Sequence, residues 1–129
     1  MSRVLLDTHV WTWTFAETGL MSLAAGQAIE AASEVLLSPL SFFEIGQKVR
    51  LGKWDDLADH AGRLQSIADE QRITLAPVDG PVAAMAALMT WEHRDPFDRL
   101  IAATALTLDV PLITRDRAFS ALADLKCIW

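Results

Sequence analysis

Acidic residues stand beside apolar segments of the kind that build a protein core: Asp7, Glu44, Asp95, Asp98 and Asp116. Carboxylates are rarely buried without a partner, because taking a charge out of water is costly. Two carboxylates about 4 Å apart repel by ~4 kcal/mol at an effective dielectric constant near 20, so a cluster of them takes up protons or binds a cation. Acids spread along the chain but all attached to core segments therefore predict one shared metal site.

The chemistry of such a site follows from its oxygen ligands. Carboxylate oxygens favour a hard ion, Mg²⁺ or Mn²⁺, over Zn²⁺. Such an ion lowers the pKa of a bound water, orients a phosphate and offsets charge on a leaving oxygen, so we expect phosphoryl chemistry. The net charge of -6 has the wrong sign for binding nucleic acid by general neutralisation of phosphates, so RNA would be accepted locally, at the metal.

Several of these acids also have simpler explanations. Asp7 could cap a helix beginning at Thr8 or His9, and Asp116 could cap one beginning at Arg117. Glu44 could pair with Lys48 one helical turn later, which is worth only a few tenths of a kcal/mol. The aromatic and aliphatic neighbours of Glu44 favour a half-buried position, where an exposed pair is not a sufficient explanation.

Asp95 and Asp98 are predicted to have different roles. With Pro96 at the first helical position, Asp95 occupies the N-cap and Asp98 lies in the first turn. Capping is enough to explain Asp95, which we expect to stand behind the metal ligands. Asp98 is the better candidate for a ligand. Ser38-Pro39 and Gly80-Pro81 predict two further helix starts, with the residue before each proline as the cap.

The order of the elements predicts an α/β fold. Short apolar runs alternate with longer helical patterns, as in βαβ units around a parallel sheet. The predicted strands are residues 3–6, 35–37, 73–78, 112–114 and 126–129, and the predicted helices are 8–16, 22–32, 39–51, 55–71, 81–91 and 96–108. Ligands collect at the carboxyl ends of parallel strands. Asp7 and Asp116 follow strands there, and the helices that carry Glu44 and Asp98 begin at the same edge.

Size and composition indicate one domain with a covered apolar surface. The 129 residues suit a single domain over residues 1–129. The hydrophobic fraction is 52% without glycine, above the ~45–50% usual for soluble domains with glycine included. Trp13 and Trp54 are candidates for contact with a second copy or a partner protein. Cys127 is predicted to be a small buried hydrophobe, and the lack of a signal-peptide or membrane-span pattern predicts a soluble intracellular protein.

Basic and histidine residues near the acidic segments are candidates for substrate contacts. Solvated surface side chains explain the lysine and the arginines at least as well, and a satisfied histidine in the first helical turn is the simpler explanation of His9. The candidates are His9, Lys48, Arg94, Arg99 and Arg115. His93 is predicted to lie in a loop from which it can contact phosphate. No set of Ser, His and Asp for nucleophilic catalysis emerges, because Ser38 and Ser41 are explained by helix-start chemistry.

Taken together, these segments resemble the PIN-domain ribonucleases, and specifically the VapC-type toxins of bacterial and archaeal toxin-antitoxin pairs. The resemblance rests on residues 5–11, 41–45 with Lys48, 93–103, and 114–116 with Phe119. Their order and spacing are specific, although each motif alone is weak. Phe43 stands where tryptophan is frequent in the family, and Thr104 where glutamine is common, which affects local packing rather than the acids.

The resemblance implies a PIN-like three-layer sandwich with a central parallel sheet of about five strands. It also implies a metal held around Asp7, Glu44, Asp98 and Asp116, endonucleolytic cleavage of RNA, a homodimer, and silencing by a cognate antitoxin that obstructs the site. Our hypothesis is therefore a cytoplasmic Mg²⁺- or Mn²⁺-dependent endoribonuclease toxin. Asp7, Asp98 and Asp116 would hold the metal, and Glu44 would bind it or orient water.

Two other hypotheses come from different classes. The first is a catalytically inactive PIN-like module that acts by occupying RNA or a partner protein. The second is a phosphatase with a nucleophilic aspartate at the end of the first strand. The phosphatase is disfavoured because His9 stands where a second acid is expected.

Overall fold

The computed structural model describes residues 2–129, which form one five-stranded parallel sheet with the order β3-β2-β1-β4-β5. The strands are β1 (Arg3–Leu6), β2 (Glu34–Leu37), β3 (Thr74–Leu75), β4 (Leu112–Ile113) and β5 (Cys127–Ile128). The central strand β1 pairs with β2 on one side and with β4 on the other. Val4, Leu5 and Leu6 are all buried, as expected for a strand covered on both faces. The prediction of a parallel α/β sheet is confirmed.

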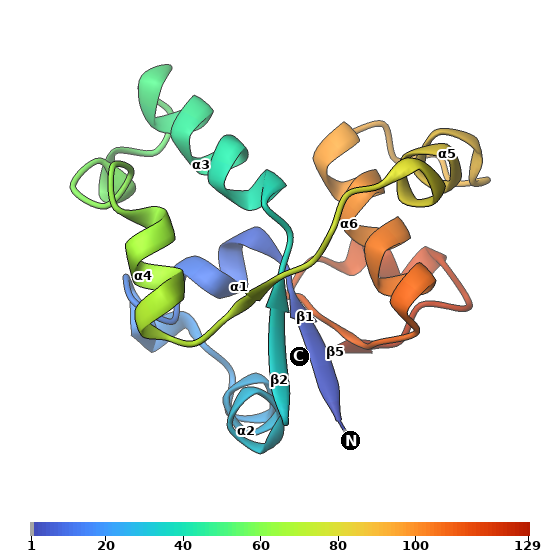
Figure 1. Cartoon of the computed structure of the whole chain (residues 1–129), viewed down its shortest axis with the longest axis horizontal. Helices are drawn as coiled ribbons and strands as arrows, with labels where there is room; N and C mark the ends of the chain where they lie inside the picture. The colour runs from blue at the N-terminus through green and yellow to red at the C-terminus, as the bar shows by residue number, and fades with distance from the viewer. Residues whose placement is uncertain (1) are drawn as a thin grey trace.

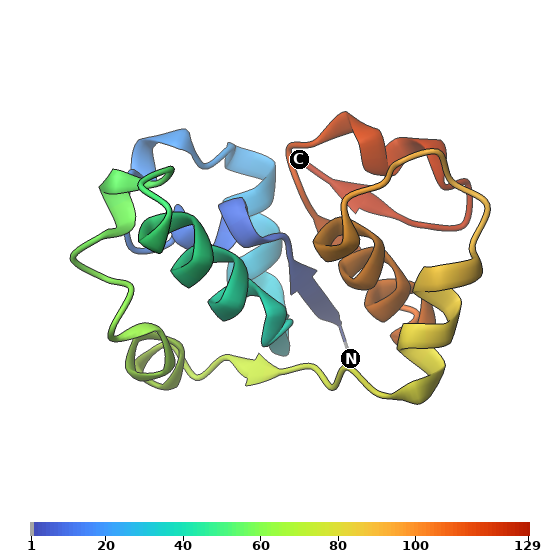
Figure 2. The ribbon, with the colours of Figure 1, turned by 90° about the horizontal axis from the view of Figure 1, so that it is seen from above.

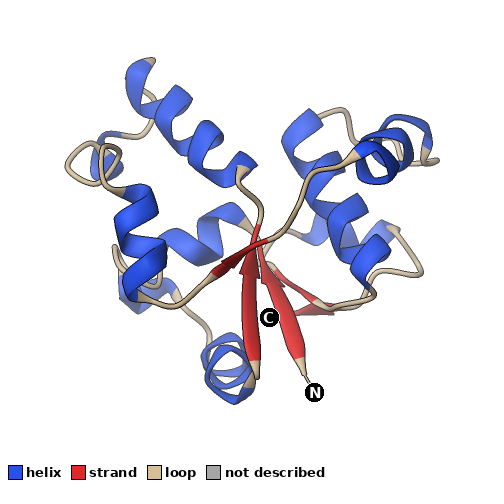
Figure 3. Ribbon diagram, viewed as in Figure 1, coloured by secondary structure: helices blue, strands red, loops and turns tan. Residues whose placement is uncertain are grey.

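Helices cover both faces of this sheet, which gives a three-layer arrangement (Figures 1 and 3). The helices are α1 (Thr8–Thr12), α2 (Leu23–Ala31), α3 (Leu40–Arg50), α4 (Leu64–Glu70), α5 (Gly80–Leu88) and α6 (Pro96–Leu108). Figure 2 shows α1 to α4 on one side of β1 and α5 with α6 on the other. The core is likewise divided between the two faces of β1. Leu6 packs in the cluster on the side of α1 to α4, and Leu5 packs in the cluster on the side of α6.

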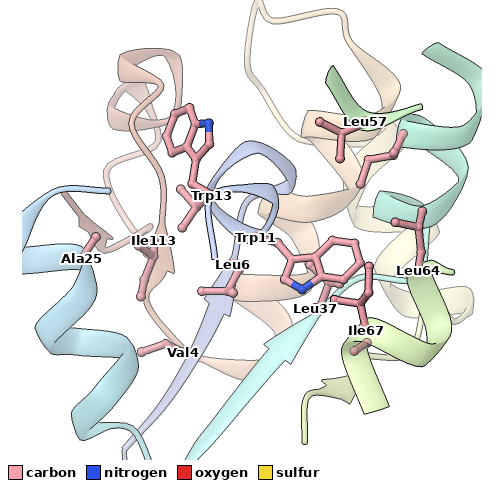
Figure 4. Close-up of a cluster of buried hydrophobic side chains, with 13 residues drawn as sticks. Val4, Leu6, Trp11, Trp13, Ala25, Leu37, Leu57, Leu64, Ile67 and Ile113 are labelled. Atoms are coloured by element: carbon pink, nitrogen blue, oxygen red, sulfur yellow. The ribbon is translucent and has the colours of Figure 1, made fainter. Parts of the chain in front are cut away.

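The cluster on the first face is built around the indole ring of Trp11 (Figure 4). This ring is fully buried and meets Phe15 and Phe42 at centroid distances of 5.0 and 5.4 Å. Its Nε1–H donates to Gln71 Oε1 at 2.8 Å, so the polar edge of the ring is also satisfied. Trp13 belongs to the same cluster and is 9% exposed. The prediction of Trp13 as a surface contact is wrong for the isolated chain.

Two predicted helices are shorter than expected. Helix α1 ends at Thr12 rather than at residue 16, because the hydroxyls of Thr12 and Thr14 donate to the carbonyls of His9 and Trp11 in a segment of β-branched and aromatic residues. The segment 55–71 is not one helix. A 3₁₀ turn (Asp55–Leu57) and α4 are separated by a turn around Gly62, whose low helix propensity permits the break. The break lets both pieces bury leucines in the core.

Other local expectations also change. Asp79 rather than Gly80 caps α5, because its Oδ1 accepts the backbone N–H of Val82. Cys127 is exposed and not part of the core. The helices described within residues 2–129 are all too short or too polar to cross a membrane.

Candidate active site

The acids predicted from the sequence meet in one cavity of ≈ 450 Å³. Its lining consists of Asp7, His9, Trp13, Glu44, Lys48, His93, Asp95, Asp98, Arg115 and Asp116. The chain brings them together because β1 and β4 end at this edge of the sheet, while α3 and α6 begin there. The predicted convergence of Asp7, Glu44, Asp98 and Asp116 is what the structure shows.

Asp7 lies at the end of β1 and acts as the N-cap of α1. Its Oδ1 accepts the backbone N–H of Thr8 at 2.8 Å, and its Oδ2 accepts the hydroxyl of Thr114 at 2.7 Å. The side chain is buried, and burial raises its pKa above the ordinary 3.8. The hydrogen bonds to Thr114 and Thr8 oppose that rise, whereas the neighbouring charge of Glu44 adds to it. Asp7 therefore both caps α1 and belongs to the acid cluster.

Glu44 is buried on α3 and paired with a cation from the same helix. Lys48 Nζ donates to Glu44 Oε2 at 2.8 Å, and the same Nζ lies 5.4 Å from the ring centroid of Trp54. The pairing was predicted as the simpler explanation, and the burial was predicted from the aromatic neighbours. Because Glu44 is 4% exposed, its pair with Lys48 is more than a solvated surface contact.

Asp98 lies in the first turn of α6 and contacts His93 from the preceding loop. His93 Nε2 lies 2.6 Å from Asp98 Oδ2. Burial raises the pKa of Asp98 from 3.8 to about 6; the hydrogen bond with His93 opposes the rise, and the charges of Asp7 and Asp95 add to it. Asp95 caps α6 as predicted, with its Oδ1 accepting the Phe97 N–H at 2.9 Å.

Asp116 follows β4 and is exposed at the mouth of the cavity. Its Oδ1 accepts the Ala118 N–H at 2.9 Å, so it caps a 3₁₀ turn (Arg117–Ala121). Its own backbone N–H donates to the hydroxyl of Thr114 at 3.0 Å. Thr114 therefore links Asp7 to the backbone of Asp116, a role that sequence analysis missed. Its position at the end of a predicted strand, two residues before an acid, was the available signal.

A second hydroxyl contact that sequence analysis missed fixes the same edge of the sheet. Thr8 Oγ1 lies 2.8 Å from Ser41 Oγ, and both residues are buried. The contact joins the start of α1 to the start of α3, and so relates Asp7 to Glu44. Ser41 was assigned only to helix-start chemistry, and the structure gives it this further contact.

Basic and aromatic side chains form the wall around the acids. The exposed ring of His9 stacks on Trp54 with a centroid distance of 4.7 Å and an interplanar angle of 28°. The Arg115 guanidinium lies 5.9 Å from the ring centroid of Trp13. Lys48 also lines the cavity. His9, Lys48 and Arg115 are thus placed where a substrate bound at the acids would meet them.

Arg99 and Arg94 do not line the acid cavity. The guanidinium of Arg99 donates to backbone carbonyls at 2.6–3.0 Å, those of Ala86, Met89, Trp91 and His93. These bonds hold the loop between α5 and α6, and Arg99 does not line the acid cavity, so the structure does not bring it to the acids. Arg94 is exposed and lines a separate hollow with Pro96 and Arg99, so the structure does not bring it to the acids.

The donor chemistry of this cavity fits a hard divalent cation. Carboxylates from four separate segments face one space, and burial together with mutual repulsion raises the pKa of Asp7 and of Asp98. A divalent cation would relieve this repulsion by supplying the opposite charge. Asp95 and His93 lie close to Asp98, with one donor atom from each of the three residues within 4.8 Å of the others.

Comparison with known proteins places the chain among proteins of the same size and fold. A family model described as "PIN domain" matches residues 4–125. "Ribonuclease VapC22" of Mycobacterium tuberculosis is 37% identical over 117 residues, which cover 91% of this chain and 89% of that protein. FitAcB from Neisseria gonorrhoeae aligns with a TM-score of 0.66 at 26% identity over 96% of this chain and 95% of its own. VapBC2 from Rickettsia felis, bound to a DNA fragment from its promoter, aligns with a TM-score of 0.65 at 14% identity over 97% and 96%, which shows the shared fold.

Proposed function

The chain belongs to the PIN-domain family of VapC-type ribonucleases, and from this premise we propose that it is an endoribonuclease toxin that cleaves RNA at its acid cavity with Mg²⁺ or Mn²⁺. The observation that carries the proposal is the convergence of Asp7, Glu44, Asp98 and Asp116 in one cavity. The fold and the named relative support the class of reaction, and the convergence of the acids supports assigning it to this cavity. The whole of residues 1–129 would act as one domain.

In this proposal Asp7, Asp98 and Asp116 hold the cation, and Glu44 binds it or orients water. When bound, the cation would lower the pKa of water, orient the phosphodiester and offset charge on the leaving oxygen. Asp7 is prepared for its role, because hydrogen bonds to Thr8 and Thr114 fix its carboxylate before any ligand binds. Asp95 would fix the start of α6 behind Asp98.

The substrate class follows from what surrounds the acids. Lys48 and Arg115 supply positive charge beside the cavity, and the exposed ring of His9 offers a face for stacking a base. These contacts suit a single-stranded phosphodiester chain, because they attract phosphate locally to a protein whose net charge of -6 would otherwise repel it. We propose His9, Lys48 and Arg115 as the RNA contacts.

The partners are proposed on the same premise. We propose that the chain forms a homodimer in the cytoplasm of a bacterium or archaeon, and that a cognate antitoxin protein covers its site. The sequence has more apolar residues than usual, and some of them are exposed. Leu23, Phe43 and Leu88 have exposed fractions of 79%, 60% and 85%, so these side chains are available to partners. Light scattering of the purified chain is expected to give the mass of a dimer, and a monomer would contradict this part of the proposal.

The cleavage proposal is tested with purified protein and a mixed RNA substrate in the presence of Mn²⁺. The native chain should cleave RNA, Asp7→Asn should not, and Asp124→Asn should cleave at the native rate. Asp124 is a matched control, because it is an exposed aspartate that does not line the cavity. RNA binding without cleavage by the native chain would favour the inactive binding module instead. Cleavage by Asp7→Asn at the native rate would refute the assigned site.

A further inference from the structure

His93 lines the acid cavity and places an imidazole nitrogen beside the carboxylate oxygens of Asp95 and Asp98. Its Nε2 is 2.6 Å from Asp98 Oδ2. Donor atoms of His93, Asp95 and Asp98 lie within 4.8 Å of one another. Ligands about 2.1 Å from one ion lie roughly 3–4 Å apart, so a cation among these three atoms requires small side-chain rotations. The ring thus stands where it can bind a cation, and not only where it can bind phosphate.

The position of His93 is fixed by contacts that do not involve the acids. Arg99 Nη1 donates to the carbonyl of His93 at 3.0 Å and to that of Trp91 at 2.8 Å. Arg99 Nη2 donates to the carbonyl of Met89 at 2.6 Å. The imidazole ring also packs against the ring of Trp91 at a centroid distance of 4.8 Å. The fold therefore holds this loop in place, so little conformational entropy remains to be lost when the ring binds a ligand.

The type of donor atom decides which cations this group favours. Mg²⁺ prefers oxygen ligands and near-ideal octahedral geometry. Mn²⁺ also suits carboxylate oxygen, but as a first-row transition metal ion it accepts a nitrogen donor more readily than Mg²⁺ does. A site with oxygens alone discriminates weakly between the two ions. One imidazole nitrogen shifts the preference toward Mn²⁺.

We propose that His93 is a ligand of the catalytic cation and gives this site a preference for Mn²⁺ over Mg²⁺. The inference rests on the proposed function, since it concerns the cation of the same cavity. Asp98 shares the cation with His93, and Asp95 stands behind them as the N-cap of α6. Arg99 is then a positioning residue, because it fixes the loop that presents His93.

The test measures metal binding without RNA, so that it is independent of cleavage. The full chain, His93→Gln and His9→Gln are compared at about pH 8, where an ordinary histidine is neutral. Glutamine keeps an amide able to hydrogen bond to Asp98 but removes the imidazole. His9→Gln is the matched control, because His9 is the histidine on another wall of the same cavity. Mn²⁺ affinity is measured by electron paramagnetic resonance titration, and Mg²⁺ affinity by competition.

We expect His93→Gln to weaken Mn²⁺ binding about tenfold or more while changing Mg²⁺ binding less than about threefold. Electron spin-echo modulation of the Mn²⁺-loaded native chain should show a coordinated imidazole nitrogen that persists in His9→Gln and disappears in His93→Gln. Equal weakening of both metals would mean that His93 only holds Asp98, and would overturn the proposal. A native spectrum without a nitrogen signal would overturn it even if His93→Gln failed to fold.

The two proposals can fail separately. A nitrogen signal from His93 in a chain that does not cleave RNA would leave the metal assignment standing and refute the ribonuclease. Cleavage with Mn²⁺ by a chain whose spectrum lacks the nitrogen signal would support the ribonuclease and refute His93 as a metal ligand.

Discussion

Replacing Asp98 by asparagine should make the metal-free protein more stable while abolishing its activity. Asp98 is partly buried in the first turn of α6, and burial together with the charges of Asp7 and Asp95 disfavours its ionised form. Asparagine keeps the shape of the side chain and a hydrogen-bonding partner for His93 Nε2, but it carries no charge. The substitution therefore removes a destabilising charge and a proposed metal ligand in one step.

The magnitude follows from the pKa of Asp98, which rises from 3.8 to about 6 on folding. One pKa unit corresponds to ~1.36 kcal/mol, so the full shift is about 3 kcal/mol, and we reduce it to about 1–2 kcal/mol because the carboxylate is partly open to screening water. The unfolded chain loses this proton near pH 3.8 and the folded chain near pH 6. The folded state binds more protons in that window, so this contribution to stability falls as pH rises through it.

The assay is thermal melting with chelator across this pH range, together with RNA cleavage in Mn²⁺. At about pH 7, Asp98→Asn should melt roughly 3–8 °C above the native chain. The difference should disappear below about pH 4, where Asp98 is protonated in both states. Added Mg²⁺ should raise the melting temperature of the native chain more than that of the variant. A variant that melts lower than the native chain at pH 7, or that cleaves RNA at the native rate, would refute the reasoning.

Three further substitutions test the supporting contacts by urea denaturation and cleavage. Asp95→Ala should cost about 0.5–2 kcal/mol as a lost N-cap, whereas Asp95→Asn should be nearly neutral in both assays; complete loss of cleavage in a folded Asp95→Asn protein would make Asp95 a ligand. Arg99→Lys should cost about 2–4 kcal/mol, because lysine cannot reach the carbonyls that the guanidinium spans; an unchanged urea midpoint would contradict this. Thr114→Val should cost about 1–3 kcal/mol by removing the partner of Asp7, and Thr114→Ser should restore it; equal stability of the two would exclude that role.

The sheet could be predicted from the sequence because its signals are local. Short apolar runs separated by helical patterns specify buried parallel strands, and each predicted strand was found in the sheet described for residues 2–129. Segment 55–71 could not be predicted with the same certainty. Its polar helical pattern continues through Gly62, and the chain bends there because both sides of the bend have leucines to bury. That advantage depends on core partners that are distant in sequence.

The convergence of the acids was predictable for a related reason. Parallel strands bring their carboxyl ends to one edge, so acids that follow strands must lie near each other. The contacts of His93 and Arg99 were not predictable, because they depend on how the loop after α5 folds back over α6. Trp13 was misassigned for a similar reason: the space that it fills beside Trp129 forms only once β5 joins the sheet.

Capping and metal binding, which the sequence presented as alternatives, are compatible in this fold. Asp7, Asp95 and Asp116 each accept a backbone N–H through Oδ1. In each case the backbone fixes the carboxylate and leaves its charge for the cavity, although Oδ2 of Asp7 also accepts the Thr114 hydroxyl. The N-cap is thus the means by which the fold orients an acid toward the cavity, as the proposed metal site requires. Asparagine preserves the cap and removes the charge, whereas alanine removes both, so the two substitutions at one position separate the stability of the fold from the chemistry of the site.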